Sequence, residues 1–319
     1  MKLYDMVRKY GWEILAVLPS IPNVRAEGNV FFVDSGQTTT GLDAADGEHG
    51  HSWDKPFLTL NFAISQCTAN QGDVILMAPG HAETLTTTAT ASGTTTTEVG
   101  VDKAGVSIIG LGTGSLRPTF TCTATAGQIA VLAANVTIEN ILMIGNVEDL
   151  TDQITLDANS DGAIIRNCEF RDSGASKEVV AQIDIAADCD DVTIDGCRFI
   201  TTVNNSAGLA AIRFVGGSDR TVIKNCVMHG DWNSAAILAT ALVSYNILIE
   251  NNYIFQLDAA VGLAISLKST TTGIVVRNLL HGGLDGTDPL SQTLCLCCEN
   301  YGTNAEAGSG ALTPDVDNL

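Results

Sequence analysis

The segment "VTIDGCRF" (Val192–Phe199) decides the fold, because close copies of it recur along the chain. These copies are "AIIRNCEF" (Ala163–Phe170), "TVIKNCVM" (Thr221–Met228) and "ILIENNYI" (Ile247–Ile254). Each copy has apolar residues, then a charged residue, then Asn or Gly, and then often Cys before a second apolar pair. Alternating apolar residues on both sides of Asn or Gly are typical of short strands joined by a tight bend.

The repeat keeps one period in two separate columns of the sequence. Alignment on the residue two before the bend gives Ile108, Ile138, Ile165, Ile194, Ile223, Ile249 and Val276, in steps of 26 to 30 residues. A second column gives Ile129, Ile154, Ile183, Ile212, Ile237, Ile265 and Leu294, in steps of 25 to 29 residues. Such a period without helical periodicity or a leucine-rich frame indicates stacked coils of short strands. We therefore predict an all-β parallel β-helix (solenoid) of about seven or more coils.

The residues at and beside the bend predict how the coils stay in register. The bend column predicts a structural Asn ladder, in which each side chain bonds to its copies above and below; its members are Asn140, Asn167, Asn225, Asn251 and Asn278. Gly110 and Gly196 replace Asn at this bend, where a left-handed turn needs no side chain. The preceding outward column alternates in charge, which favours an in-register stack; it reads Glu139, Arg166, Asp195, Lys224, Glu250 and Arg277.

Composition limits the partners and the compartment. The 319-residue chain has a formal net charge of −20, so we expect neither nucleic acid nor an anionic membrane surface as a partner. The nine cysteines lack the spacing of a secreted disulfide module, and most fall in apolar strand patterns. This predicts reduced thiols. No window approaches the length of a membrane span, and no signal peptide is recognised at the N-terminus, so we expect a soluble, unprocessed chain.

The chain divides into four predicted segments. Residues 1–27 form an arm, residues 28–100 an N-terminal cap and first coil, residues 101–300 the β-helix, and residues 301–319 a C-terminal tail. Helical spacing after Pro56, with Leu60, Ile64 and Cys67 on one face, predicts a capping helix before "VILMAPG", the first strand of the coils. The arm has one apolar helical face that predicts partner docking; its residues are Leu3, Met6, Val7, Tyr10, Trp12 and Ile14. It packs either along its own β-helix or into a neighbouring subunit.

Candidate catalytic and metal-binding residues are sparse. The densest acidic cluster, Asp188, Asp190 and Asp191, precedes a strand at a position where Asp is common in turns. We expect "EHGHSWD" (Glu48–Asp54) to be a solvated loop and His81 to be structural. In "CLCC" (Cys295–Cys298), alternation places Cys295 and Cys297 on one face of the last coil, so we expect Cys295, Cys297 and Cys298 to pack near the end of the rod and not to bind zinc. No phosphate-binding, dinucleotide or nucleophile motif is present in a usable context. We therefore expect no catalytic residue, no metal ligand and no cofactor.

The segment that leads into the β-helix, which we call the entry segment, is "KPFLTLNFAISQCTANQGDVILMAPGHAETL" (Lys55–Leu85). Together with "AGVSIIGLG" and the Asn-Cys bends, it resembles phage virion proteins with a pectate-lyase-like β-helix. The resemblance spans about residues 28 to 283. It implies a right-handed β-helix and localisation in the virion after synthesis in the host cytoplasm. It also implies a non-enzymatic surface protein, either a capsid decoration (cement) protein or a head or tail spike subunit. The expected partners are major capsid or tail proteins and further copies of the chain, with a trimer favoured.

Two other functions stay open at this point. The first is a tail-associated polysaccharide depolymerase (a lyase or a hydrolase) with carboxylates gathered from separate coils. The second is a module that binds a host surface glycan without cleaving it. The low aromatic content of 5% and the short C-terminal tail favour the decoration protein, because a glycan groove usually needs aromatic platforms and acids together.

Overall fold

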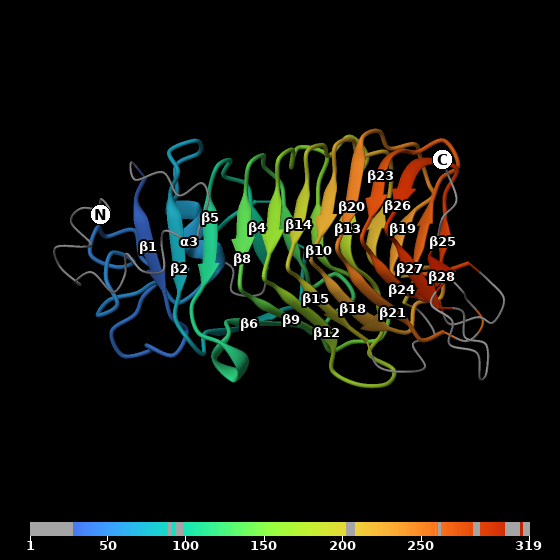
Figure 1. Ribbon diagram of the computed structural model, residues 1–319. Helices are drawn as coiled ribbons and strands as arrows, with labels where there is room; N and C mark the ends of the chain where they lie inside the picture. Colours follow the sequence, from blue (N-terminus) through green and yellow to red (C-terminus); the bar gives the residue numbers. More distant parts are fainter. Residues whose placement is uncertain are drawn as a thin grey trace.

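The computed structural model describes residues 28–88, 91–93, 98–201, 208–258, 260, 263–282, 288–303 and 313–314. These residues form a rod of stacked coils, with the N-terminal strands at one end and the C-terminal strands at the other (Figure 1). Successive coils pair in parallel along three long sheets, and the shortest of these sheets has eight strands. The predicted all-β, right-handed parallel β-helix is confirmed.

Sheet 1 has the strand order β1-β2-β5-β8-β11-β14-β17-β20-β23-β26. Its bounds are Val30–Val33, Val74–Met77, Ser107–Gly110, Thr137–Glu139, Ile164–Arg166, Thr193–Asp195, Val222–Lys224, Ile247–Glu250, Thr272–Val276 and Leu294–Cys298. Sheet 2 runs from β3 through β6, β9, β12, β15, β18, β21, β24 and β27 to β28. Its bounds are Ala82–Leu85, Thr119–Cys122, Leu142–Gly145, Glu169–Asp172, Arg198–Ile200, Val227–Gly230, Tyr253–Gln256, Leu279–His281, Tyr301–Thr303 and Thr313–Pro314.

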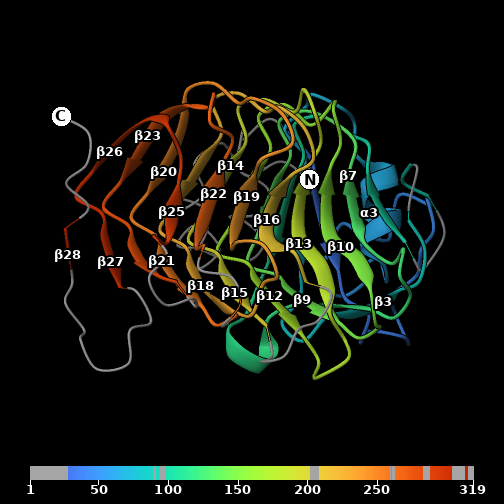
Figure 2. The same ribbon diagram turned by 90° about the vertical axis from the view of Figure 1, so that its right-hand side faces the viewer.

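Sheet 3 has the order β4-β7-β10-β13-β16-β19-β22-β25 and faces the viewer in Figure 2. Its bounds are Val99–Val101, Ile129–Val131, Leu150–Leu156, Val179–Ile185, Ala210–Phe214, Ile237–Ala239, Ile265–Leu267 and Leu290–Ser291. Two short helices complete the described elements: α3 (Leu60–Gln66) and the 3₁₀ turn η2 (Gly114–Leu116). Among the described residues, no helix has the length and apolar character needed to cross a membrane.

The core is a set of columns in which one inward residue of each coil lies on its copy in the next. Ile138, Ile165, Ile194 and Ile223 are paired in register on sheet 1 and are at most 1% exposed. On sheet 2, Phe170 and Phe199 stack with ring centroids 4.9 Å apart and an interplanar angle of 7°. The period found in the sequence is therefore the repeat of these inward columns.

The predicted columns are wrong by a few residues in the last coil. Val275, not Val276, pairs with Ile249, and Leu290, not Leu294, pairs with Ile265. Leu294 belongs to sheet 1, where it pairs with Thr272. Alternation alone could not set the register here, because Ile274, Val275 and Val276 are all β-branched and apolar.

The bend between sheets 1 and 2 is a left-handed residue in each coil from Asn140 to Glu299, whereas Gly110 ends β5 without a positive φ, so the left-handed turn predicted there is wrong. The Asn ladder predicted at the bend is largely absent. Asn140, Asn167, Asn225 and Asn251 have φ between 53° and 58°, as Asn tolerates. Asn251 Nδ2 donates to Asn225 Oδ1 at 2.9 Å, whereas the other three amides donate to backbone oxygens or to acidic side chains of the preceding coil. These Asn side chains lie at the outer corner of the coil. Each one links its coil to the preceding coil, but the acceptor differs from coil to coil.

Asn278 does not belong to this bend, and its predicted place in the ladder is wrong. Arg277 takes the left-handed position with φ 55°, and Asn278 points inward and is completely buried. Asn278 lies in an inner corner column with Asn252 and Asn300. In the preceding coils this column is Cys168, Cys197 and Cys226, as the sequence alignment placed them.

The Asn residues of the inner corner column donate to backbone carbonyls of the preceding coil, whereas each Cys thiol lies between two carbonyls. The Sγ atoms of Cys168, Cys197 and Cys226 lie 3.5–3.8 Å from the carbonyls of Ile138, Ile165 and Ile194 in the preceding coil, and 3.2–3.6 Å from carbonyls of their own coil. The amides of Asn252, Asn278 and Asn300 donate to Ile223, Ile249 and Val275 at 2.8–3.0 Å. Each of the three Asn Oδ1 atoms also accepts a backbone N–H from the preceding coil. The inner corner is thus the buried amide ladder of this protein.

The N-terminal cap is built around α3, as predicted. Thr59 caps the helix by accepting from Phe62 N, and Asp43 holds the Leu58 and Thr59 backbone N–H groups. The helix is buried from Leu60 to Ile64 and contacts β1, β2 and β4. "VILM" forms β2, but it is not the first strand of its sheet, because β1 pairs with its outer edge. The arm residues predicted to dock a partner lie outside the described residues.

Candidate functional sites

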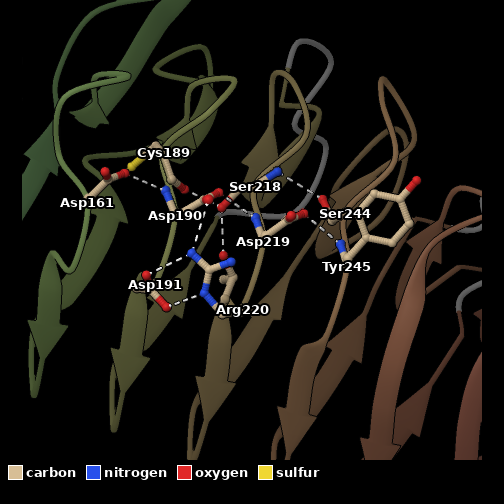
Figure 3. Close-up of polar contacts among 10 residues, drawn as sticks. Asp161, Cys189, Asp190, Asp191, Ser218, Asp219, Arg220, Ser244 and Tyr245 are labelled. Carbon is tan, nitrogen blue, oxygen red and sulfur yellow. Dashed lines mark hydrogen bonds and ion pairs between the residues drawn. The ribbon is translucent and has the colours of Figure 1, made fainter.

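The acidic turn cluster predicted at Asp188, Asp190 and Asp191 is part of a ladder of turns at the junction of sheets 3 and 1 (Figure 3). Asp161, Asp190 and Asp219 lie one above the other, and each Oδ1 accepts a backbone N–H of the next coil at 2.8 Å. The last of these donors is Tyr245 N. Asp188 and Asp191 both have left-handed backbones. The carboxylates of Asp161, Asp190 and Asp219 thus satisfy backbone N–H groups of the turns, which agrees with the predicted turn position of Asp190.

Arg220 neutralises the outer part of this cluster. Its Nε lies 2.7 Å from Asp191 Oδ1, and one terminal nitrogen lies 2.9 Å from Asp191 Oδ2 and 3.1 Å from Asp190 Oδ2. The hydrogen bond from Arg220 lowers the pKa of Asp191 and raises the pKa of Arg220. Asp191 therefore stays ionised near neutral pH, which is the wrong state for a general acid.

The other candidates from the sequence are also engaged in structure. In the loop before the cap, Asp46 accepts the Glu48 and His49 backbone N–H groups at 2.9 Å, and its other oxygen lies 2.6 Å from His49 Nδ1. These bonds lower the pKa of Asp46. Cys295 and Cys297 are buried and Cys298 is exposed. Over the part of the chain that is described, no group of three or more His, Cys, Asp or Glu side chains is placed to hold a metal ion.

His81 is a buried structural residue with a defined tautomer. The Ser35 backbone N–H can only donate, so His81 Nδ1, 3.0 Å away, accepts and the proton lies on Nε2. Nε2 then donates to Glu83 Oε1 at 2.7 Å, and the same oxygen accepts Leu60 N at 2.7 Å. His81 and Glu83 thereby tie the loop after β1 to the start of α3.

The alternating charges of sheet 1 form ion pairs between coils. Arg166 pairs with Glu139 at 2.8 Å and Lys224 pairs with Asp195 at 3.6 Å, while Arg277 also contacts Glu250. Five of the six predicted residues share one paired column, and Arg277 lies one residue beyond it. The charged side chains on the outer face of sheet 1 therefore stabilise contacts between neighbouring coils.

One acidic group that the sequence analysis missed lies on sheet 3. Asp152 is 3% exposed, and its Oδ1 accepts from Thr155 Oγ1 at 2.5 Å. Burial, together with the charge of nearby Asp184, raises its pKa to about 6. Asp184, in the next coil, has a pKa raised by burial even though it accepts a hydrogen bond from Arg213 Nε at 2.7 Å. A carboxyl group with a pKa near 6 can donate or accept a proton at neutral pH.

A second feature that the sequence analysis missed is apolar. Twelve large apolar side chains are exposed among the described residues, and seven of them lie on the outer faces of sheets 1 and 2 at the C-terminal end. We call these seven the apolar flank: Val227, Tyr253, Ile274, Leu279, Leu294, Leu296 and Tyr301. They are between 39% and 56% exposed. A concentration of this kind is typical of a contact surface, because scattered single residues would need no explanation.

Next to this flank, three rings stack along the rod. Phe255 lies between His229 and His281, with centroid distances of 5.4 and 4.1 Å and interplanar angles of 17° and 15°. Both faces of Phe255 are therefore covered by neighbouring rings. A sugar stacks on an open ring face, so this column is a lateral stack between coils and not a glycan platform at Phe255.

No protein-family model matches this chain, and no curated protein matches it. Among solved structures, the chain is similar to a rhamnogalacturonan lyase, with a TM-score of 0.38 and 13% sequence identity. The alignment covers 80% of this chain and 69% of the other. A similarity this distant bears on neither the activity nor the substrate of the present chain.

Proposed function

We propose that this chain is a non-enzymatic structural protein of a phage particle. In this proposal it is mounted on the particle surface as a capsid decoration (cement) protein or as a head or tail spike subunit. The resemblance of its entry segment and bends to phage virion proteins supplies the setting. The observation that supports a structural role is the pairing of outer charged side chains between neighbouring coils. The acids and bases in the outer column of sheet 1 pair between coils, and seven exposed apolar side chains form a flank suited to contacts.

The test is a binding experiment with particles that lack the protein. Purified chain is added back and the particles are imaged by cryo-electron microscopy. Regular density over the capsid lattice supports decoration, and density at one vertex or at the tail supports a spike subunit. Particles that carry no added density at saturating protein contradict the proposal.

Asp152 and Asp184 favour a second candidate, a polysaccharide depolymerase. They come from neighbouring coils, β10 and β13, and both have raised pKa values. If Asp152 is a proton donor or acceptor, Asp152→Asn removes glycan cleavage and leaves glycan binding intact. The screen measures reducing ends and unsaturated products on bacterial surface polysaccharides. Asp191→Asn, which alters a carboxylate already paired with Arg220, is the matched control.

A further inference from the structure

Three free thiols lie one above another at the inner corner of the middle coils. Cys168, Cys197 and Cys226 occupy equivalent positions in successive coils, because the strands on both sides of them pair in register. Each of the three is 1% exposed, and the thiol of Cys197 is within hydrogen-bonding reach of the other two. The column has Ile141 before Cys168 and Asn252 after Cys226, so sulfur occupies three consecutive positions. We call these three residues the thiol column.

The spacing of the coils allows a disulfide between neighbours in the thiol column and between no other pair of its members. Bridged cysteines usually have Cα atoms about 4.4 to 6.8 Å apart, and stacked parallel strands place in-register Cα atoms about 4.8 Å apart. Cys197 is therefore within bridging distance of Cys168 on one side and of Cys226 on the other. Cys168 and Cys226 are two coils apart, roughly 9.6 Å, which is too far for a bridge.

The corner itself does not require sulfur. In the later coils the same corner holds the amides of Asn252, Asn278 and Asn300, which donate to carbonyls at 2.8–3.0 Å. The thiols lie between carbonyls at 3.2–3.8 Å, and a thiol is a weaker donor than an amide. What a pair of stacked thiols offers, and a pair of amides does not, is two-electron oxidation to a covalent link.

We propose that the thiol column is an oxidation site, in which Cys197 is the shared member of a disulfide that joins two neighbouring coils. The oxidant is hydrogen peroxide or a similarly small, uncharged peroxide, because a bulky disulfide reagent does not fit at thiols that are 1% exposed. The inference stands on the geometry of the thiols and holds for each of the functions considered above.

The reaction has two steps. Burial opposes the ionisation of both thiols, but hydrogen bonds from Cys197 and from the Ile141 backbone lower the pKa of Cys168, so Cys168 is the first of the pair to ionise. Its thiolate attacks one oxygen of the peroxide, the O–O bond breaks and hydroxide leaves, which turns Cys168 into a sulfenic acid. The sulfur of Cys197 then attacks the sulfur of Cys168, the S–O bond breaks, and the proton of Cys197 leaves with that oxygen as water. In total, two thiols and one hydrogen peroxide give one disulfide and two molecules of water.

The first experiment counts thiols in the full chain with Cys298→Ala, which removes the one exposed cysteine of the nine. The folded protein is treated with hydrogen peroxide, the peroxide is destroyed with catalase, and the chain is then unfolded in excess maleimide and weighed. We expect two thiols to be lost, dithiothreitol to restore them, and peptide mapping to place the bridge at Cys197. A chain that keeps all its thiols, a loss that dithiothreitol does not reverse, or a bridge without Cys197 overturns the inference.

Single variants in the same background test the central position of Cys197. Cys197→Ala should abolish the bridge, because the two thiols that remain are too far apart, and Cys197→Ser replaces it if that variant misfolds. Cys168→Ala and Cys226→Ala each leave one adjacent pair, so each should still form a bridge. Cys189→Ala, at a buried cysteine outside the thiol column, is the matched control and should oxidise like its parent. A bridge that survives Cys197→Ala, or one that is lost in both Cys168→Ala and Cys226→Ala, contradicts the arrangement.

The consequence for the rod is a link between coils that depends on redox conditions. A disulfide between neighbouring coils closes one coil of the chain, so it restricts the unfolded state and should lower the unfolding equilibrium constant on the order of tenfold or more. Denaturation of the oxidised and the reduced chain measures this change, and Cys197→Ala should unfold alike before and after peroxide. An oxidised chain that carries the bridge and is no more stable than the reduced chain would overturn its role as a link between coils.

Discussion

The middle coils of the rod, from β8 to β17, differ from the C-terminal coils, from β18 to β27, on both sides of the same backbone. Outside, the middle coils carry paired charges such as Glu139 and Arg166, whereas the C-terminal coils expose the apolar flank. Inside the corner, the middle coils carry thiols, whereas the C-terminal coils carry the buried amides of Asn252, Asn278 and Asn300. The middle coils are thus charged outside with thiols at the inner corner, whereas the C-terminal coils are largely apolar outside with amides at the inner corner.

This contrast shows that stacking is specified differently at the two ends of one solenoid. In the middle coils, outer ion pairs select the register, because like charges would oppose a shifted stack. In the C-terminal coils one outer ion pair remains, between Arg277 and Glu250, and the other outer positions of sheets 1 and 2 are largely apolar, so charge contributes less to the register. There the inner amides select the register, because each Asn matches one carbonyl and one N–H of the preceding coil. The C-terminal outer face is therefore apolar and exposed without loss of register.

The largest effect is expected from Asn278→Ala. The substitution removes the acceptor of Asn252 N and the donor to Ile249 O, both in a fully buried corner. Each buried group left without a partner costs about 1–3 kcal/mol, so we expect a loss of roughly 3–5 kcal/mol in the free energy of unfolding. Chemical denaturation monitored by circular dichroism measures it.

The matched control is Cys197→Ala, at the same corner position in the middle coils. This change deletes one sulfur and a weak contact to Ile165 O, and it should cost only about 1–2 kcal/mol. Equal losses for the two variants would show that the amides add nothing to what the thiols do. The contrast between the two ends of the inner corner would then be without energetic meaning.

Asp152 is a buried acid of the middle coils that accepts a hydrogen bond from Thr155 Oγ1, and it should make stability depend on pH. Its pKa is about 6 in the folded chain and 3.8 in its unperturbed state. Between these values the folded chain binds more protons than the unfolded chain, so the free energy of unfolding falls as pH rises from about 4 to about 6. Asp152→Asn should reduce this slope, leaving the part due to the raised pKa of Asp184, and should raise stability at pH 7 by about 1–3 kcal/mol.

Thermal unfolding of both proteins from pH 4 to pH 8 measures this difference. Asp191→Asn is the opposite control, because Arg220 lowers the pKa of Asp191. The stabilising contribution of Asp191 is present above its unperturbed pKa and is lost as pH falls below it. A parent protein whose stability does not change between pH 4 and pH 6 would show that Asp152 is not buried in the way described.

The ion pairs of the two regions should differ in strength. Arg166 and Glu139 have side chains only 10% and 12% exposed, while Arg277 is 54% exposed. A double-mutant cycle on Glu139 and Arg166 should give a coupling energy of about 1–2 kcal/mol, because low exposure reduces screening by solvent. The cycle on Glu250 and Arg277 should give a smaller coupling that disappears in 0.5 M salt. Similar values for both cycles would remove electrostatics from the comparison.

The sequence predicted the fold because inward columns repeat with a period that chance does not produce. Its register is correct for Ile108 to Ile249 and fails at Val276, where three β-branched residues in a row hide the inward position. Aligning Asn278 with the bend was natural, because Asn serves both the outer bend and the inner corner in this chain. Only three-dimensional placement separates the two roles.

The candidate sites were less predictable. Asp152 and Asp184 look like ordinary outward residues of two strands, and the burial that raises their pKa values comes from neighbouring coils. The apolar flank was hidden for a similar reason. In "LCLCC" and "YIFQ", inward and outward positions are both apolar, so alternation cannot show which side faces solvent. The position of Asp190 and Asp191 in a turn was predictable from the sequence, but their partners, Asp219 N and Arg220, lie in the next coil and were not.

The smallest effect is expected at the bend itself, where the middle coils use Asn or Gly and the last coils use Arg277 and Glu299. Glu299 has φ 54°, a left-handed conformation that costs a residue with a Cβ about 1–2 kcal/mol, whereas Asn and Gly adopt it readily. Glu299→Gly should therefore stabilise the chain by about 0.5 kcal/mol after the greater chain entropy of Gly is subtracted. The reverse change in the middle coils, Gly196→Glu, should destabilise, because a Cβ at Gly196 would also lie 2.8 Å from Asn167 Oδ1. Denaturation midpoints of the two variants measure both shifts. Opposite signs mean that the bend conformation is shared along the rod and that its residues alone differ, which confines the difference between the two regions to their faces and their inner corner.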